Sequence, residues 1–129
     1  MEKGDTFLMG APKCSKKHLW VLISDPKKHS GCGVVVNIST DRERTGEECP
    51  LSVGDHPWLS EPVSWLCFSD AILLTQKAWV EIQNGIKSRF IVVERKCPDE
   101  CLQKIIAGAK ASAASLTGAF PGNLLIYLD

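Results

Sequence analysis

His18-Leu19-Trp20-Val21-Leu22-Ile23-Ser24 and Gly33-Val34-Val35-Val36-Asn37-Ile38-Ser39-Thr40 are the two stretches of sequence that decide the fold. Apolar and β-branched residues fill both stretches, which is typical of buried strands, and a loop that contains Asp25-Pro26 separates them. If the two strands pair antiparallel, the start of the first lies beside the end of the second. The sequence therefore predicts a small sheet whose rim brings together polar side chains from both strands: Lys16, Lys17, His18, Ser39 and Thr40.

The rest of the chain divides into a β-rich front and a helix-rich back. At 129 residues, the chain fits a single domain, 1–129, that can bury its own core. Thr75 is expected to cap a helix that Gly85 ends, and apolar residues at helical spacing predict a second helix from Pro98 to Leu116. Further strands are expected over residues 5–9, 64–68, 71–74 and 89–95. We expect an α+β domain with a β-barrel core of about 4–95 and a C-terminal helical part of about 97–129.

Charge is balanced over the whole chain but unevenly distributed along it. Residues 1–30 hold six lysines against three acids, whereas residues 41–70 hold two arginines against seven acids. This pattern predicts a dipolar molecule whose lysine-rich side attracts anions. It supports nucleic-acid binding only weakly, because the domain as a whole is not basic, and the alternative is a solvated lysine face.

The six cysteines are interpreted as reduced thiols of a cytoplasmic protein, because the Met1 end lacks the apolar run of a secretory signal. No apolar window approaches the length of a membrane span, so no membrane partner is expected. Three spacings are usable for zinc, namely Cys14-x3-His18, His29-x2-Cys32 and Cys97-x3-Cys101, but none is a paired Cys-x2-Cys motif. We therefore expect no metal site and no cofactor.

The order of the expected elements resembles that of the MazF/PemK-like toxins of bacterial toxin–antitoxin pairs. The likeness covers about residues 4–113 and begins with Gly4-Asp5 before the first strand; an acidic loop and a strand that leads into a helix follow later. This resemblance implies a small, partly open SH3-like barrel with appended C-terminal helices. It also implies a homodimer, an antitoxin protein as partner, and metal-independent cleavage of single-stranded RNA.

Those toxins carry an arginine at the start of the strand that corresponds to 18–24, and a threonine or serine at the end of the strand that corresponds to 34–40. Thr40 or Ser39 fits the second requirement, whereas Lys17 and His18 stand where the arginine would be. His18 would act as general base on a ribose hydroxyl, and Lys16 and Lys17 would meet the phosphate. The alternative is that His18 only begins a strand.

A second group of candidate residues is Gly54-Asp55-His56-Pro57-Trp58. Asp55 could orient the His56 imidazole, and Trp58 offers a flat face for an unstacked base. Asp70 is a further candidate for anchoring either histidine. Because acid and base groups must converge on one phosphate, the hypothesis places His56 at the same rim as His18. The alternative is a turn that Asp55 and Pro57 stabilise.

These residues predict a toxin-like endoribonuclease, in which the ribose 2′-hydroxyl attacks its own phosphate. The competing prediction is a non-catalytic binding module for nucleic acid or a protein partner, since open strand edges serve binding equally well. A homodimer is expected because the apolar face of the terminal helix, with Leu102, Ile105 and Ile106, needs a surface to cover it.

Overall fold

The computed structural model describes residues 1–10, 17–39, 50–52, 55–57, 59 and 63–128. Three of the candidate residues, Lys16, Thr40 and Trp58, lie outside this range. The described strands form one six-stranded sheet in the order β4-β5-β3-β2-β1-β6, and every neighbouring pair is antiparallel. The strands are β1 (Thr6–Gly10), β2 (Lys17–Leu22), β3 (Gly33–Ser39), β4 (Pro50–Ser52), β5 (Val63–Leu74) and β6 (Val92–Glu94).

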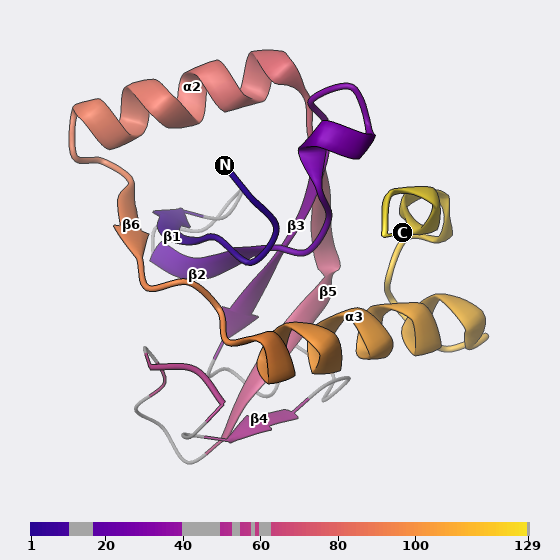
Figure 1. Cartoon of the computed structure of the whole chain (residues 1–129). Helices are drawn as coiled ribbons and strands as arrows, with labels where there is room; N and C mark the ends of the chain where they lie inside the picture. The colour runs from indigo at the N-terminus through magenta and orange to yellow at the C-terminus, as the bar shows by residue number, and fades with distance from the viewer. Residues whose placement is uncertain (11–16, 40–49, 53–54, 58, 60–62, 129) are drawn as a thin grey trace.

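Helices cover the sheet from both sides (Figure 1). Helix α2 (Gln76–Lys87) lies on one face, and α3 (Asp99–Ala114) lies on the other. The short 3₁₀ helix η1 (Pro26–Lys28) joins β2 to β3, and η2 (Gly122–Tyr127) ends the described chain beside α3. The predicted α+β class is confirmed. In the described residues the sheet ends at β4 and β6 and is not closed, so the predicted SH3-like barrel is not confirmed.

Burial of β3 on both faces explains why its sequence is continuously apolar. Alternate residues of a strand point to opposite faces, and both faces of β3 are covered, so all seven of its residues are buried. Val34, Val36 and Ile38 join the core beneath α3 and η2, whereas Val35 joins the core beneath α2. The sheet therefore separates two apolar cores.

Strand β5 is one element where the sequence predicted two. It runs unbroken from Val63 to Leu74, and its pairing with β3 shifts register between Val35 and Asn37. The shift accommodates the extra residues around Ser69 and Asp70, which is how a bulge lets a strand continue past polar positions. Composition alone marks the same positions as a break.

The C-terminal end of α2 also differs from the prediction. Thr75 caps α2 as expected, since its Oγ1 accepts from the N–H of Ala78, but the helix continues past Gly85 to Lys87. Gly85 lies where the returning chain packs on the helix, and a Cβ there would come 2.6 Å from Cδ1 of Ile91. The glycine thus permits a close approach rather than ending the helix.

The apolar face of α3 is buried within its own chain. Leu102, Ile105 and Ile106 pack against the sheet and belong to the core shared with β2, β3 and β5. This face therefore gives no reason to expect a homodimer, because it needs no second subunit to cover it. Among the described residues, no helix has the length and apolar character needed to cross a membrane.

The turn after α3 returns the chain onto the helix, and it supplies a test of the fold. Ser112 Oγ accepts from the N–H of Phe120, and a Cβ at Gly118 would overlap the carbonyl oxygen of Ser112. We expect Gly118→Ala to lower the free energy of unfolding by about 1–3 kcal/mol, because backbone atoms cannot move aside easily. Gly122→Ala is the matched control: nothing lies within 4 Å of its Cβ. Urea denaturation of both variants makes the comparison, and equal stability would contradict this packing.

Candidate functional site

His18 and Ser39 lie on the same face of the sheet, at neighbouring strand ends. Leu19 pairs with Ile38, so the next step of the same register brings His18 opposite Ser39. On its other side His18 pairs with Met9, which packs into the core beneath α2. The antiparallel pairing of β2 with β3 is observed as far as Leu19 and Ile38, and the meeting of His18 with Ser39 stays a prediction from that register.

Lys17 has a partner in the described structure. Its Nζ donates to the carbonyl oxygen of Phe90 at 2.8 Å, while the side chain stays exposed. This bond fastens the start of β2 to the segment that joins α2 to β6. Because an ammonium carries three N–H donors, the bond does not prevent contact with an anion.

His56 lies on the opposite side of the sheet from His18. Its Nε2 is 3.1 Å from the carbonyl oxygen of Arg95, which also accepts from Thr6 Oγ1 at 2.6 Å. Thr6 is in register with Val21, which packs beneath α3. A carbonyl can only accept, so Nε2 carries the proton. The predicted convergence of the two histidines is therefore wrong.

Burial also removes His56 from contact with a substrate. The side chain is 1% exposed, and burial lowers the pKa of the imidazole below its ordinary value. Beside it, Asp55 Oδ2 accepts from Nζ of Lys104 on α3 at 3.3 Å. Asp55 and His56 thus attach the turn to α3 and to the residue after β6 by long-range contacts, whereas the stated alternative was a local turn that Asp55 and Pro57 stabilise.

Asp70 holds a buried amide. Its Oδ2 accepts from Nδ2 of Asn37 at 3.2 Å, and Asn37 is fully buried in the middle of β3. Among the described residues, Oδ1 of Asn37 has no hydrogen-bond partner. Leaving a buried amide unpaired costs about 1–3 kcal/mol, so Asp70 stabilises β3 at the bulge. This contact gives Asp70 a structural role beside the functional one predicted for it.

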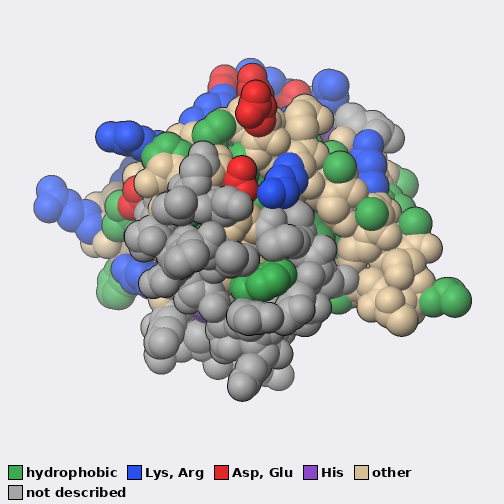
Figure 2. All heavy atoms as spheres, turned by 90° about the horizontal axis from the view of Figure 1, so that it is seen from below, with side chains coloured by type: hydrophobic (Ala, Val, Ile, Leu, Met, Phe, Trp, Pro, Cys, Tyr) green, Lys and Arg blue, Asp and Glu red, His purple; other side chains and the backbone are tan. Residues whose placement is uncertain are grey.

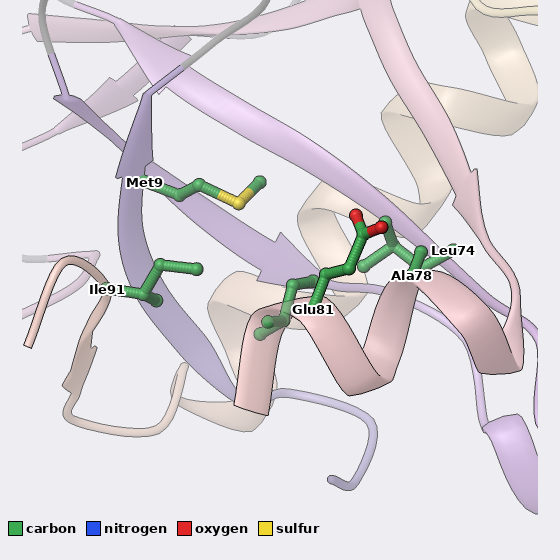
Figure 3. Close-up of a pocket in the computed structure, with 6 residues that line it drawn as sticks. Met9, Leu74, Ala78, Glu81 and Ile91 are labelled. Atoms are coloured by element: carbon green, nitrogen blue, oxygen red, sulfur yellow. The ribbon is translucent and has the colours of Figure 1, made fainter. Parts of the chain in front are cut away.

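An apolar pocket between α2 and the sheet was not predicted from the sequence. It has a volume of about 280 Å³, and Met9 and Ile91 face Leu74, Ala78 and Glu81 across it (Figure 3). Ile82 completes the lining. The Glu81 carboxylate is the acidic group of this lining. Helical spacing of Ala78, Glu81 and Ile82 could have signalled one wall, but the opposite wall comes from Met9 of β1 and from Ile91 in the segment before β6.

Exposed apolar side chains gather around β6, next to this pocket. Phe90 is 75% exposed, Val92 is 42% exposed and Val93 is 52% exposed. Val93 pairs with Phe7 and faces the α2 side, whereas Val92 pairs with Leu8 and faces the α3 side. Edge strands of monomeric proteins are usually short or carry charge or proline; β6 has three residues with Glu94 as its charge, and its two exposed valines, next to the exposed Phe90, make it a candidate contact surface.

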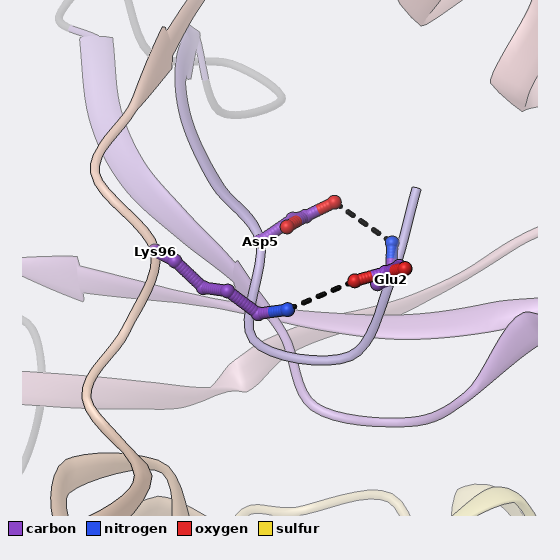
Figure 4. Close-up of polar contacts among 3 residues, drawn as sticks. All are labelled: Glu2, Asp5 and Lys96. Carbon is purple, nitrogen blue, oxygen red and sulfur yellow. Dashed lines mark hydrogen bonds and ion pairs between the residues drawn. The ribbon is translucent and has the colours of Figure 1, made fainter.

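A second hollow, of about 250 Å³, is lined by charged residues near the N-terminus: Glu2, Lys3, Asp25, Lys27 and Lys96. Lys96 Nζ lies 3.0 Å from Glu2 Oε2, and the N–H of Glu2 donates to Asp5 (Figure 4). The hydrogen bond from Lys96 lowers the pKa of Glu2. Two carboxylates offset three lysines here, so the hollow does not concentrate positive charge.

The described surface gives no sign of a metal centre or of one dominant charge. No group of three or more His, Cys, Asp or Glu side chains among the described residues is arranged to hold a metal ion. Figure 2 shows the side that α3 and β4 occupy, and there the basic and acidic side chains of the described residues are interspersed. Among these sites, the β6 edge with its neighbouring pocket and the rim of His18 and Ser39 are the two candidate functional sites.

The buried His56 predicts a specific dependence of stability on pH. Because native His56 binds a proton less readily than a histidine of the unfolded chain, protons favour the unfolded state as the pH falls below the ordinary value of 6.5. The stability is complete above that value and is lost towards the lower native pKa. Each unit of pKa difference is worth about 1.4 kcal/mol. We expect His56→Gln to flatten the fall in unfolding free energy between about pH 7.5 and 5.5.

Thr6→Val is the control for this measurement. It removes the other side-chain donor to the Arg95 carbonyl but changes no titratable group. The variant should be less stable at every pH while keeping the slope of the wild-type protein. An unchanged slope in His56→Gln would show that another group carries the pH dependence.

Comparison with known proteins does not assign this chain to a family. No protein-family model matches the chain, and no curated protein matches it. The resemblance to MazF/PemK-like toxins therefore stays a hypothesis that rests on the order of the elements, and the function is argued from the two candidate sites.

Proposed function

We propose that this protein is a binding module that takes an extended segment of a partner protein along the open edge of β6. In strand addition, main-chain hydrogen bonds supply affinity and alternate side chains supply specificity. β6 pairs with β1 on one side only among the described strands, so its outer side is available for such bonds. The observation that carries the proposal is the exposure of Val92 and Val93 on opposite faces of this edge.

The neighbouring pocket indicates what kind of segment would fit. Ile91 lines the pocket and lies on the same face as Val93, so the apolar surface is continuous from the edge into the hollow. An aliphatic or aromatic side chain of the partner would find apolar contacts there, and the Glu81 carboxylate would attract a basic residue beside it. An antitoxin protein, which the resemblance implies, would be one such partner.

Selection from a library of displayed random peptides tests this proposal. We expect the protein to enrich peptides that alternate aliphatic and polar residues and carry a basic residue. Val93→Lys should weaken the binding of a selected peptide by about tenfold or more, because a charge then occupies the apolar edge. Ile126→Lys is the matched control, because it changes an apolar residue on η2 that is 69% exposed, against 52% for Val93.

A chemical control distinguishes strand addition from nonspecific binding to apolar surface. A selected peptide methylated on alternate backbone nitrogens loses the N–H groups that strand pairing needs, so it should no longer bind. Binding that survives both methylation and Val93→Lys would place the contact elsewhere.

Light scattering at micromolar concentration tests the expected homodimer on the same variants. If two copies pair through β6, the wild type has twice the 14.1 kDa chain mass and Val93→Lys has the chain mass.

The placement of His18 beside Ser39 favours a second candidate function, metal-independent cleavage of single-stranded RNA. A partly exposed imidazole near the start of β2 is suited to proton transfer. The mechanism now has one histidine rather than two, because His56 is buried on the other side of the sheet. His18 would take the proton of the ribose 2′-hydroxyl, the 2′-oxygen would displace the 5′-oxygen from phosphorus, and water would protonate the leaving oxygen; Ser39, at 5% exposure, would support the strand end beside His18 rather than meet the phosphate.

Cleavage of a labelled single-stranded RNA in the presence of a chelator tests this second candidate. We expect His18→Ala to lower the cleavage rate by about 100-fold or more, as loss of a general base does. His29→Ala alters a histidine that packs on Tyr127 and should keep the activity. His56→Gln should also keep it where the variant is folded. Intact RNA after long incubation with wild-type protein would leave the binding module as the function.

A further inference from the structure

The pocket between α2 and the sheet has an apolar floor and a charged mouth. Leu74 and Ile82 are 5% and 4% exposed, so they form the floor. Met9 and Ile91 are partly buried and line one side, whereas Glu81 is exposed. In Figure 3 the Glu81 carboxylate points from α2 into the space between Met9 and Leu74. A molecule that enters from solvent therefore meets a carboxylate first and an apolar surface behind it.

Hydrogen bonds hold the walls of the pocket in place without a ligand. The N–H of Ile91 donates to the carbonyl oxygen of Gly85 at 3.0 Å, which fastens this wall to α2. The carbonyl oxygen of Met9 accepts from Nε1 of Trp20 at 3.1 Å, which fastens the other wall to β2. The volume of about 280 Å³ is near the lower end of ligand pockets, about 300 Å³. The preformed space therefore fits a small molecule.

The Glu81 carboxylate is available to such a molecule. Among the residues that the structure describes, neither an ion pair nor a hydrogen bond holds it. Lys77 lies one turn earlier on α2, at a spacing that permits an ion pair, but these two described side chains form none. Apolar walls beside the carboxylate keep water away from one side of a bound cation, which strengthens the attraction between opposite charges. The pocket thus favours a molecule that joins an ammonium group to a short apolar tail.

We propose that this pocket binds a small amphipathic amine, whose alkyl or aryl group lies on Leu74 and Ile82 and whose ammonium group pairs with Glu81. The proposal goes beyond strand addition at β6, because such a ligand needs neither a strand edge nor a partner protein. Amine binding is measured without any peptide, and methylation of the peptide backbone tests strand addition alone. Failure of one proposal is therefore distinguishable from failure of the other.

Chemical-shift titration of the isotope-labelled full chain with three probes of equal chain length tests the proposal. We expect hexylammonium to shift the amide signals of Ala78, Glu81 and Ile82 and to bind in the millimolar range, as so small a ligand does. 1-Hexanol has the same tail without a charge and should bind about fivefold more weakly. Hexanoate carries the opposite charge and should bind most weakly of the three.

Two variants and a matched control assign the contacts. Glu81→Gln removes the charge at an exposed position of the helix, so it should bind hexylammonium and hexanol equally well. Glu100→Gln makes the same change at an exposed position of α3 and should keep the preference of the wild-type protein. Ala78→Leu fills the pocket and should abolish the binding of all three probes. Circular dichroism confirms that each variant is folded.

Four results would overturn the proposal. A preference for hexylammonium that survives Glu81→Gln would show that the carboxylate does not hold the ammonium group. Binding of hexanoate as tight as that of hexylammonium would remove the role of charge. Undiminished binding to Ala78→Leu would place the ligand outside the pocket, and wild-type signals that do not shift with hexylammonium would exclude the site.

Discussion

The antiparallel pairing of β2 with β3 is the constraint on which the rest of the structure depends. It fixes which residues of the two most apolar strands share a face, with Val21 opposite Val36 beneath α3 and Trp20 opposite Asn37 beneath α2. A shift of one residue would exchange the faces and leave each core with the wrong side chains. Because both faces are apolar, the chain needs a cover on each side, and α2 and α3 supply one cover each.

The two faces consequently have different chemistry. The α3 side holds the buried His56, the Asp55–Lys104 pair and the buried side chains of Cys97 and Cys101, all near the connection from β6 to α3. The α2 side of the sheet holds the apolar pocket, and His18 and Ser39 lie on the same side, at the ends of β2 and β3. A sheet with side chains packed on both faces offers no path between them. A site on the α2 face must therefore be built without side chains of the α3 face, whereas an edge strand such as β6 presents residues of both faces.

Local patterns in the sequence predicted the elements better than they predicted the site. The central strands, the Thr75 cap and the α+β class follow from periodicity and capping, which depend on neighbouring residues. The place of His56 depends on its bond to Arg95, a partner 39 positions away, and nothing near Asp55-His56-Pro57 signals it. The exposure of Val92 and Val93 was equally unpredictable from the sequence. Their composition is that of a buried strand, and only the strand order places them at an edge.

The covers of the sheet come after the sheet along the chain. Strands β1 to β5 lie within residues 6–74, whereas α2, α3 and η2 occupy 76–127. Chains are made from the N-terminus, so β1 to β5 leave the ribosome before α2 and α3. A sheet that forms at that stage has two uncovered apolar faces. The bonds that complete the fold, such as Thr6 to Arg95 across 89 positions, form only after most of the chain has been synthesised. During folding in a cell, the packing of the two helices on the sheet thus competes kinetically with the association of uncovered sheets from different chains.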